Sequence, residues 1–330
     1  MAKYEKKDAR TYSREIFKGV WAAVTTPFKD DLSLDEEGIR YNVRYCKNLG
    51  ITGIFTNGII GEFWTLTFEE KKRAIKAAVD ESIKQGIKTI VQTGSTSAQE
   101  VVDLSNYADE CGADVVCIIP PFFNSGQGAE SVWNDRLAFN FFDYIQKRIS
   151  IGFWIFDTTY TGRKLSDDFY ERLANTAEHF VGIKQGRGYD AFCSLQDRVG
   201  DRLIVASPVE PLLYRYITER GLGVFMANPT PLEIQTIDDP KMIKYATAAW
   251  SGDLEVAKRG SDELEPVREL VRKYHGIDNY EGVVPIQYHK AWMELLGLKA
   301  GPVRPPLPNL SPDEKAALKK DLISVGLIKE

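Results

Sequence analysis

The stretch that decides the fold is FVGIKQGRG, residues 180–188, in which an apolar run ends at Lys184 and passes into a glycine-rich turn. Removing an ammonium group from water disfavours its charged form, so a lysine at the end of a buried strand has a lowered pKa. The neutral amine is the form that attacks a carbonyl carbon and makes an imine, or Schiff base. A lysine at a strand end more commonly reaches water through its flexible stem. The surrounding architecture therefore has to decide between the two interpretations.

Short apolar runs alternate with amphipathic helical patterns along most of the chain. The strands predicted from them are residues 20–25, 53–57, 89–93, 115–120, 151–156, 181–184, 203–206 and 223–227, and the helices include 35–49, 67–85, 98–111, 166–175 and 211–219. Continuous apolar runs are typical of parallel strands buried on both faces. Eight such units without hairpin signals predict an α/β fold, a (β/α)8 TIM barrel with a C-terminal helical extension. A doubly wound open sheet is the alternative, disfavoured because no GxGxxG motif follows the first strand.

Three parts are expected along the chain. Residues 1–16 form an N-terminal extension, either disordered or an arm for oligomerisation. Residues 17–238 form the barrel, and residues 239–330 form a C-terminal helical region and tail. Three helices are expected between about 239 and 296, followed by an extended proline-rich tail from Gly301.

Composition excludes several classes of function. The net charge of −5 is spread over interspersed acidic and basic residues, which argues against a nucleic-acid or membrane partner. Apolar stretches are no longer than strands, and the charged N-terminus has no apolar signal core. Four scattered cysteines indicate reduced thiols and a cytoplasmic protein. The three histidines are far apart in the sequence, so no metal site is expected, and no pattern indicates a cofactor.

In a (β/α)8 barrel the chemistry lies at the carboxyl ends of the strands. Of the side chains at these ends, only Lys184 is a nucleophile with a built-in reason for activation, its apolar surroundings. The glycine-rich turn at residues 186–188 could bind an anion, but this indication is weaker than the one for Lys184.

Four segments together resemble the N-acetylneuraminate lyase and dihydrodipicolinate synthase superfamily of class I lyases, over residues 17–307. They are GVWAAVTTPF (19–28), GIIGE (58–62), GIK (182–184) and GPVRPPL (301–307). The resemblance implies that Lys184 condenses with a 2-oxo acid, commonly pyruvate, without a cofactor. It also implies a homotetramer built as a dimer of dimers, and a structural role for Glu62.

The sequence departs from this family at the residues that normally accompany the lysine. Ile59 and Ile60 stand where two hydroxyl residues bind the substrate carboxylate, and neither side chain donates a hydrogen bond. Phe156 replaces the catalytic tyrosine, and a second tyrosine corresponds to Phe122 or Phe123. Losing a general acid or base costs about 10²–10⁴ in rate. The dihydrodipicolinate synthase and sialic-acid lyase reactions themselves are therefore not expected.

Substitutes for the missing groups are present nearby. The expected acid or base is Asp157, Thr158 or Tyr160, or a carboxylate or phenol of the substrate itself. The backbone N–H groups of Ile59 and Ile60, in the turn that starts at Gly58, remain able to bind a carboxylate. Further substrate-binding candidates are Arg163, which matches a family arginine behind a short insertion, and Asn228. Alternatively the pocket is apolar because the substrate is an aryl or alkyl carbonyl compound, as for hydratase-aldolases. The aromatic residues proposed to line it are Phe63, Trp64, Phe122, Phe123, Trp154 and Phe156.

Three functions follow from these observations. The first is a Schiff-base lyase, a class I aldolase or hydratase-aldolase, that cleaves a carbon–carbon bond in a small carbonyl substrate. The second keeps the imine but dehydrates or decarboxylates a 2-oxo or 3-oxo acid, with Arg163 and Arg187 as anion partners. The third is a non-catalytic barrel that binds a ligand or serves as a structural subunit. His289 and Tyr288 are expected to pack or form an interface.

Overall fold

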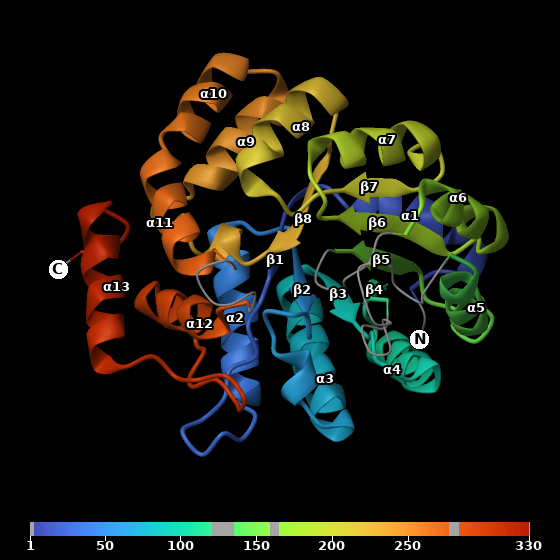
Figure 1. Ribbon diagram of the computed structural model, residues 1–330, viewed down its shortest axis with the longest axis horizontal. Helices are drawn as coiled ribbons and strands as arrows, with labels where there is room; N and C mark the ends of the chain where they lie inside the picture. The colour runs from blue at the N-terminus through green and yellow to red at the C-terminus, as the bar shows by residue number, and fades with distance from the viewer. Residues whose placement is uncertain (1–2, 121–134, 159–164, 277–283, 330) are drawn as a thin grey trace, which may run out of the picture.

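The computed structural model describes residues 3–120, 135–158, 165–276 and 284–329. Eight parallel strands form its centre, paired in the order β7-β6-β5-β4-β3-β2-β1-β8 (Figure 1). They are β1 Gly19–Ala23, β2 Gly53–Thr56, β3 Lys88–Gln92, β4 Val115–Ile118, β5 Phe153–Asp157, β6 Phe180–Gln185, β7 Ile204–Ala206 and β8 Val224–Asn228. A parallel bridge between Ser207 and Phe225 joins the two end strands. The (β/α)8 barrel is confirmed, and the open-sheet alternative is wrong.

Helices surround the strands and follow them one by one. They are α2 Glu36–Leu49, α3 Phe68–Gln85, α4 Ala98–Cys111, α5 Asp135–Gln146, α6 Asp167–Thr176, α7 Tyr189–Val199, α8 Leu213–Arg220 and α9 Lys241–Ser251. Side-chain caps start several of them: Thr67 and Glu70 form a reciprocal capping box, and Ser97 accepts from the N–H of Glu100. These caps satisfy N–H groups that the first helical turn leaves without a partner.

The N-terminal segment is ordered from residue 3, so the prediction of disorder is wrong there. A 3-10 turn, η1 Lys6–Asp8, leads into helix α1 Ala9–Ile16, which packs against β6. The Arg10 guanidinium donates to the backbone oxygens of Ala174, Ala177 and Phe180, at 2.6, 2.9 and 3.0 Å. Because carbonyl oxygens need hydrogen-bond donors, these three bonds from Arg10 fix the extension to the amino-terminal side of the barrel.

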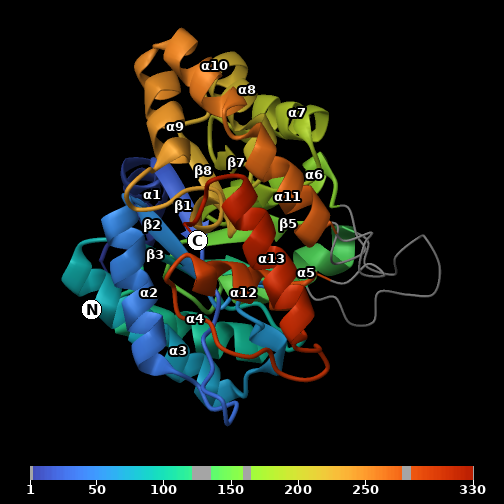
Figure 2. The ribbon, with the colours of Figure 1, turned by 90° about the vertical axis from the view of Figure 1, so that its left-hand side faces the viewer.

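More helices follow the barrel than expected. Where three helices were predicted between about 239 and 296, the described residues form four: α9, then α10 Leu254–Asp262, α11 Glu265–His275 and α12 Ile286–Leu295. Residues of the predicted tail form a further helix, α13 Pro312–Ser324, started by a capping box of Ser311 and Glu314. Figures 1 and 2 show α11, α12 and α13 grouped on one side of the ring. Helix α9 packs against β1 and so belongs to the ring, although it lies beyond residue 238; the domain boundaries stay a prediction.

A buried ion pair fixes these helices to the barrel. Glu210, in the turn η4 Glu210–Leu212 after β7, accepts two hydrogen bonds from Arg268 of α11, at 2.8 and 2.9 Å. The Tyr245 hydroxyl of α9 donates to the same carboxylate at 2.6 Å. Because the carboxylate and the guanidinium are both buried, each neutralises the other's charge where water cannot. No helix in the described ranges is long and apolar enough to cross a membrane.

Candidate active site

Lys184 lies on β6, paired in register with Phe156 of β5 and Ala206 of β7. Its side chain is 4% exposed, and its Nζ lies 4.0 Å from the centre of the Phe156 ring and 4.6 Å from that of Phe55. Removal from water lowers the pKa of the Lys184 amine from 10.5 to about 8, opposed by the nearby Cys117 thiol. The amine is therefore close to the balance between charged and neutral forms at physiological pH.

A cavity of about 450 Å³ opens above this amine. Its walls come from the carboxyl ends of β1, β2, β5, β6 and β8, from the loops after β2, β5, β6, β7 and β8, and from α11. The lining residues used below are Phe55, Gly58, Ile59, Ile60, Phe156, Thr158, Lys184, Glu210, Asn228, Thr230 and Val271. Most of the wall is apolar, and Lys184 and Glu210 are the ionisable groups among its described lining residues. Since Glu210 is occupied by Arg268, the lysine is the one reactive charge that this wall presents.

The loop after β2 is a tight turn, and its residues Gly58, Ile59 and Ile60 line the cavity. Gly61 N–H donates to the Gly58 carbonyl and Glu62 N–H to the Ile59 carbonyl, both at 3.0 Å. Within the described ranges, the N–H groups of Ile59 and Ile60 donate to no acceptor. A Cβ on Gly58 would lie 2.5 Å from the Phe55 ring, so a side chain there would displace the ring beside the lysine. The turn thus offers two amide donors in place of the side-chain hydroxyls that the sequence lacks.

Glu62 connects this loop to the C-terminal region, as expected of a structural residue. It is fully buried, adopts a left-handed φ of 53°, and pairs with Lys290 of α12 at 2.7 Å. Its second carboxylate oxygen accepts from the N–H of Arg304 at 3.0 Å. A left-handed glutamate is uncommon and persists only where its surroundings hold it. The pairing with Lys290 and Arg304 supplies that restraint.

Asp157 does not lie in the cavity wall, which corrects its predicted place beside the lysine. Successive side chains of a strand point to opposite faces, so Phe156 and Thr158 face the cavity while Asp157 points away. Its carboxylate is buried and pairs with Arg187. Burial raises the pKa of Asp157, and Arg187 opposes this rise. Arg187 itself is absent from the described wall, so the anion partner proposed for dehydration or decarboxylation is held elsewhere.

The other candidates divide into those that line the cavity and those that the structure does not describe. Gly58, Ile59, Ile60, Phe156, Thr158 and Asn228 all line the cavity with Lys184. The Asn228 amide already donates to the Pro208 carbonyl at 2.7 Å and accepts from Thr230 N–H, so it joins the loops after β7 and β8. Phe122, Phe123, Tyr160 and Arg163 lie outside the described residues.

The expected aromatic lining is only partly present. Trp154 is fully buried and its ring lies 4.6 Å from that of Phe17, away from the cavity. Trp64 is 41% exposed, and Phe63 packs against it. Phe55, Glu210 and Val271 line the cavity but were not identified from the sequence. Only Phe55 gave a usable signal, because it lies near the carboxyl end of a predicted strand.

The fold and the site together describe a (β/α)8 barrel that carries a buried lysine, with a lowered pKa, at the carboxyl end of β6. The chain belongs to the dihydrodipicolinate synthetase family, whose model matches residues 16–324. It is 30% identical over 318 residues to the 4-hydroxy-tetrahydrodipicolinate synthase of Methanosarcina mazei, covering 95% of this chain and 100% of that protein.

Solved structures agree with this assignment. A dihydrodipicolinate synthase superposes with a TM-score of 0.78 at 25% identity, over 94% of this chain and 100% of the other. N-acetylneuraminate lyase from Proteus mirabilis has the same fold, with a TM-score of 0.79 at 19% identity over 94% and 99% of the two chains. The superfamily inferred from the sequence is confirmed, and membership supports an enzyme of the aldolase or lyase type.

Proposed function

We propose that Lys184 forms an imine with a small carbonyl substrate, and that this imine drives cleavage of a carbon–carbon bond. The observation that carries the proposal is the buried amine at the floor of an apolar cavity, with its pKa lowered to about 8. At pH 7 about one amine in eleven is then neutral, against about one in three thousand for an ordinary lysine. That difference raises the concentration of the nucleophile about 300-fold.

In the proposed reaction, the nitrogen of the protonated imine accepts the electron pair of the bond that breaks. Lys184 Nζ adds to the carbonyl carbon, and water leaves to give a protonated imine. A base then removes the proton from the β-hydroxyl group of the substrate, the Cα–Cβ bond breaks, and its electron pair moves toward nitrogen to give an enamine. An aldehyde departs. Protonation of the enamine and hydrolysis of the imine return the free lysine and a second carbonyl product.

The free amides of Ile59 and Ile60 support a 2-oxo acid or an aryl-substituted derivative as the substrate. A carboxylate placed on these donors would bring the adjacent carbonyl carbon to the lysine, because both groups line the same cavity. The apolar remainder of the wall, with Phe55 and Phe156, suits an aryl or alkyl group beyond the bond that breaks. Thr158 is the hydroxyl group on the β5 side, and Tyr160 stays the sequence-based candidate for the base.

Reductive trapping tests the imine directly. The protein is incubated with pyruvate, or with one of a panel of aryl and aliphatic ketones and aldehydes, then reduced with borohydride and measured by intact mass. Peptide mapping locates the adduct, and Lys290 is the internal comparison because it is a second buried lysine that is ion-paired. We expect an adduct on Lys184 that is lost in Lys184→Met.

Each outcome has a distinct meaning. A pyruvate adduct on Lys184 would support a 2-oxo acid as the substrate. An adduct formed only with another carbonyl compound would keep the imine and change the substrate class. No adduct on Lys184 with any member of the panel would overturn the proposal in favour of a non-catalytic barrel.

A further inference from the structure

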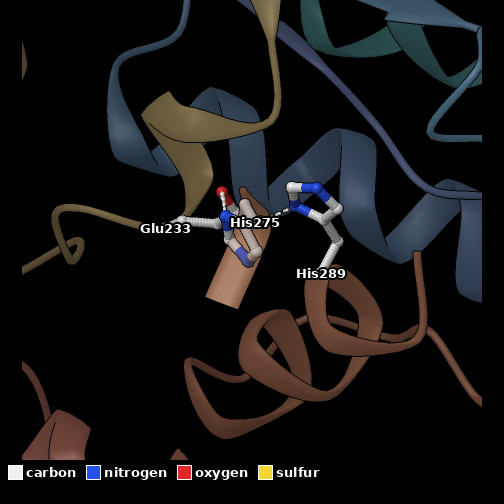
Figure 3. Close-up of side chains that lie close together, drawn as sticks. All are labelled: Glu233, His275 and His289. Carbon is white, nitrogen blue, oxygen red and sulfur yellow. Dashed lines mark hydrogen bonds and ion pairs between the residues drawn. The ribbon is translucent and has the colours of Figure 1, made fainter. Parts of the chain in front are cut away.

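A cluster outside the proposed active site brings together three side chains that can bind a metal ion. Glu233 follows the turn η5 Thr230–Leu232 after β8, His275 ends α11, and His289 lies in α12 (Figure 3). One ligand atom from each side chain lies within 4.8 Å of the other two. Among the described residues, these three side chains are the group of potential metal ligands that meets this distance. Glu233 is fully buried, and the imidazoles of His275 and His289 are 6% and 7% exposed.

Several polar atoms of this cluster have no hydrogen-bond partner within the described ranges. They are both ring nitrogens of His275 and the Oε2 atom of Glu233. A buried polar atom without a partner is costly, because it has lost its water and gained nothing in exchange. Three other buried carboxylates near this end of the barrel each have a cationic partner: Glu62 pairs with Lys290, Glu210 with Arg268 and Asp157 with Arg187. Glu233 contacts two imidazoles and no lysine or arginine among the described residues, so a bound cation would neutralise its carboxylate.

We propose that Glu233, His275 and His289 bind a divalent transition-metal ion of the zinc type. Two imidazoles and one carboxylate are a donor set that zinc uses with one position left for water or another ligand. With bonds of about 2.1 Å, adjacent ligand atoms of a tetrahedral site lie about 3.4 Å apart. His275 Nδ1 lies 3.5 Å from Glu233 Oε2, close to this spacing, whereas His289 Nδ1 lies 2.6 Å from Glu233 Oε1 and must move apart from it to share an ion.

Binding requires two local changes that the cluster permits. The His275 and His289 rings stack with centres 3.7 Å apart and planes 28° apart, whereas an ion must lie in the plane of each ring that binds it. His275 can turn about its Cβ–Cγ bond without breaking a hydrogen bond, since its nitrogens have none. The 2.6 Å hydrogen bond from His289 Nδ1 to Glu233 Oε1 is replaced when the ion displaces its proton.

Surrounding contacts indicate that the site ties the C-terminal helices to the barrel. Trp292 Nε1 donates to the Glu233 carbonyl at 2.9 Å, and its ring lies 5.1 Å from that of His275. Glu233 follows Thr230 by three residues and His275 follows Val271 by four, and both Thr230 and Val271 line the cavity. An ion there would hold the back of that wall without touching the substrate. The proposal is independent of the imine.

The experiment uses the full-length protein, freed of metal with a chelator and dialysed. Zn²⁺ content is measured after loading and removal of excess, Co²⁺ is added to record the visible bands of a four-coordinate ion, and the melting temperature is compared with and without Zn²⁺. We expect one ion per chain, cobalt bands, and a melting temperature that rises with Zn²⁺.

Variants separate this cluster from adventitious binding. Glu233→Gln, His275→Gln and His289→Gln each remove one ligand and should weaken Zn²⁺ binding by more than about 100-fold, beyond the loss caused by an outer partner. His179→Gln is the matched control, because His179 is also buried with two unpaired ring nitrogens but lies outside the cluster. Circular dichroism confirms that each variant is folded. The proposal would be overturned if the wild type did not retain Zn²⁺, or if Zn²⁺ did not raise its melting temperature. It would also be overturned if the three cluster variants bound Zn²⁺ as tightly as the wild type.

Discussion

Replacing Lys184 with methionine should make the protein more stable while abolishing imine formation. The folded protein holds this amine at a pKa of about 8, against 10.5 for an ordinary lysine. A difference of one unit corresponds to about 1.4 kcal/mol, so at pH 7 burial of the amine costs about 3 kcal/mol of the free energy of unfolding. Methionine has a similar length and no charge to desolvate. We therefore expect Lys184→Met to recover up to about 3 kcal/mol.

The gain should depend on pH in a defined direction. Because the folded pKa is lowered, the unfolded chain binds more protons between about pH 8 and 10.5, and wild-type stability rises with pH across this window. Below pH 8 the full cost is present, and above 10.5 it vanishes. The advantage of Lys184→Met should thus shrink to about 1 kcal/mol at pH 10.

Urea unfolding at pH 7 and pH 10, at fixed protein concentration, measures this difference as a shift in midpoint. Lys290→Met is the matched control, since Lys290 is equally buried but pairs with Glu62 at 2.7 Å. Removing it leaves a buried carboxylate without its cation, so that variant should lose about 3–5 kcal/mol. A Lys184→Met protein less stable than wild type at pH 7 would refute the reasoning, because the amine would then be making a stabilising contact.

Three further predictions concern the site, the helical extension and the assembly. The rate of borohydride-trapped imine formation should rise with pH and level off above about pH 8, the pKa of Lys184; a rise continuing to pH 10 would mean that burial does not activate the amine. Arg268→Leu should lower stability by about 3–5 kcal/mol in urea unfolding because it leaves Glu210 buried, whereas the exposed Arg272→Leu on the same helix should change it by less than about 1 kcal/mol. Light scattering after size exclusion should report four chains of 37.2 kDa, and a single chain in solution would contradict the tetramer that the family resemblance implies.

Local patterns in the sequence were sufficient for most of the architecture. Continuous apolar runs located every strand to within a few residues, and the caps at Thr67 and Ser97 marked helix starts, because both signals act over a few neighbouring residues. Lys184 was found for the same reason, as a charged residue ending an apolar strand. Helix α13 was missed although Ser311 and Glu314 carried the same capping signal, since the preceding prolines favoured an extended tail.

The site could be predicted only in part, because a residue belongs to it only if its side chain points into the cavity, and position in the sequence does not fix that direction. Asp157 and Phe156 are neighbours in one strand, yet the pleat turns one toward Arg187 and the other toward the lysine. Trp154 has the apolar character of a pocket wall but faces Phe17 instead. Val271 enters the cavity from α11, eighty-seven residues after Lys184, and no local signal could place it there.

The sequence alone determined the barrel, the buried lysine and the loss of hydroxyl groups at Ile59, Ile60 and Phe156, since these depend on residue type and short-range pattern. Only the tertiary structure decided which groups meet. Wide spacing in the chain argued against a metal site, yet folding brings Glu233, His275 and His289 within 4.8 Å of one another. The physical reason is that burial of apolar faces packs α11 and α12 beside the loop after β8, and this packing sets distances that separation along the chain does not.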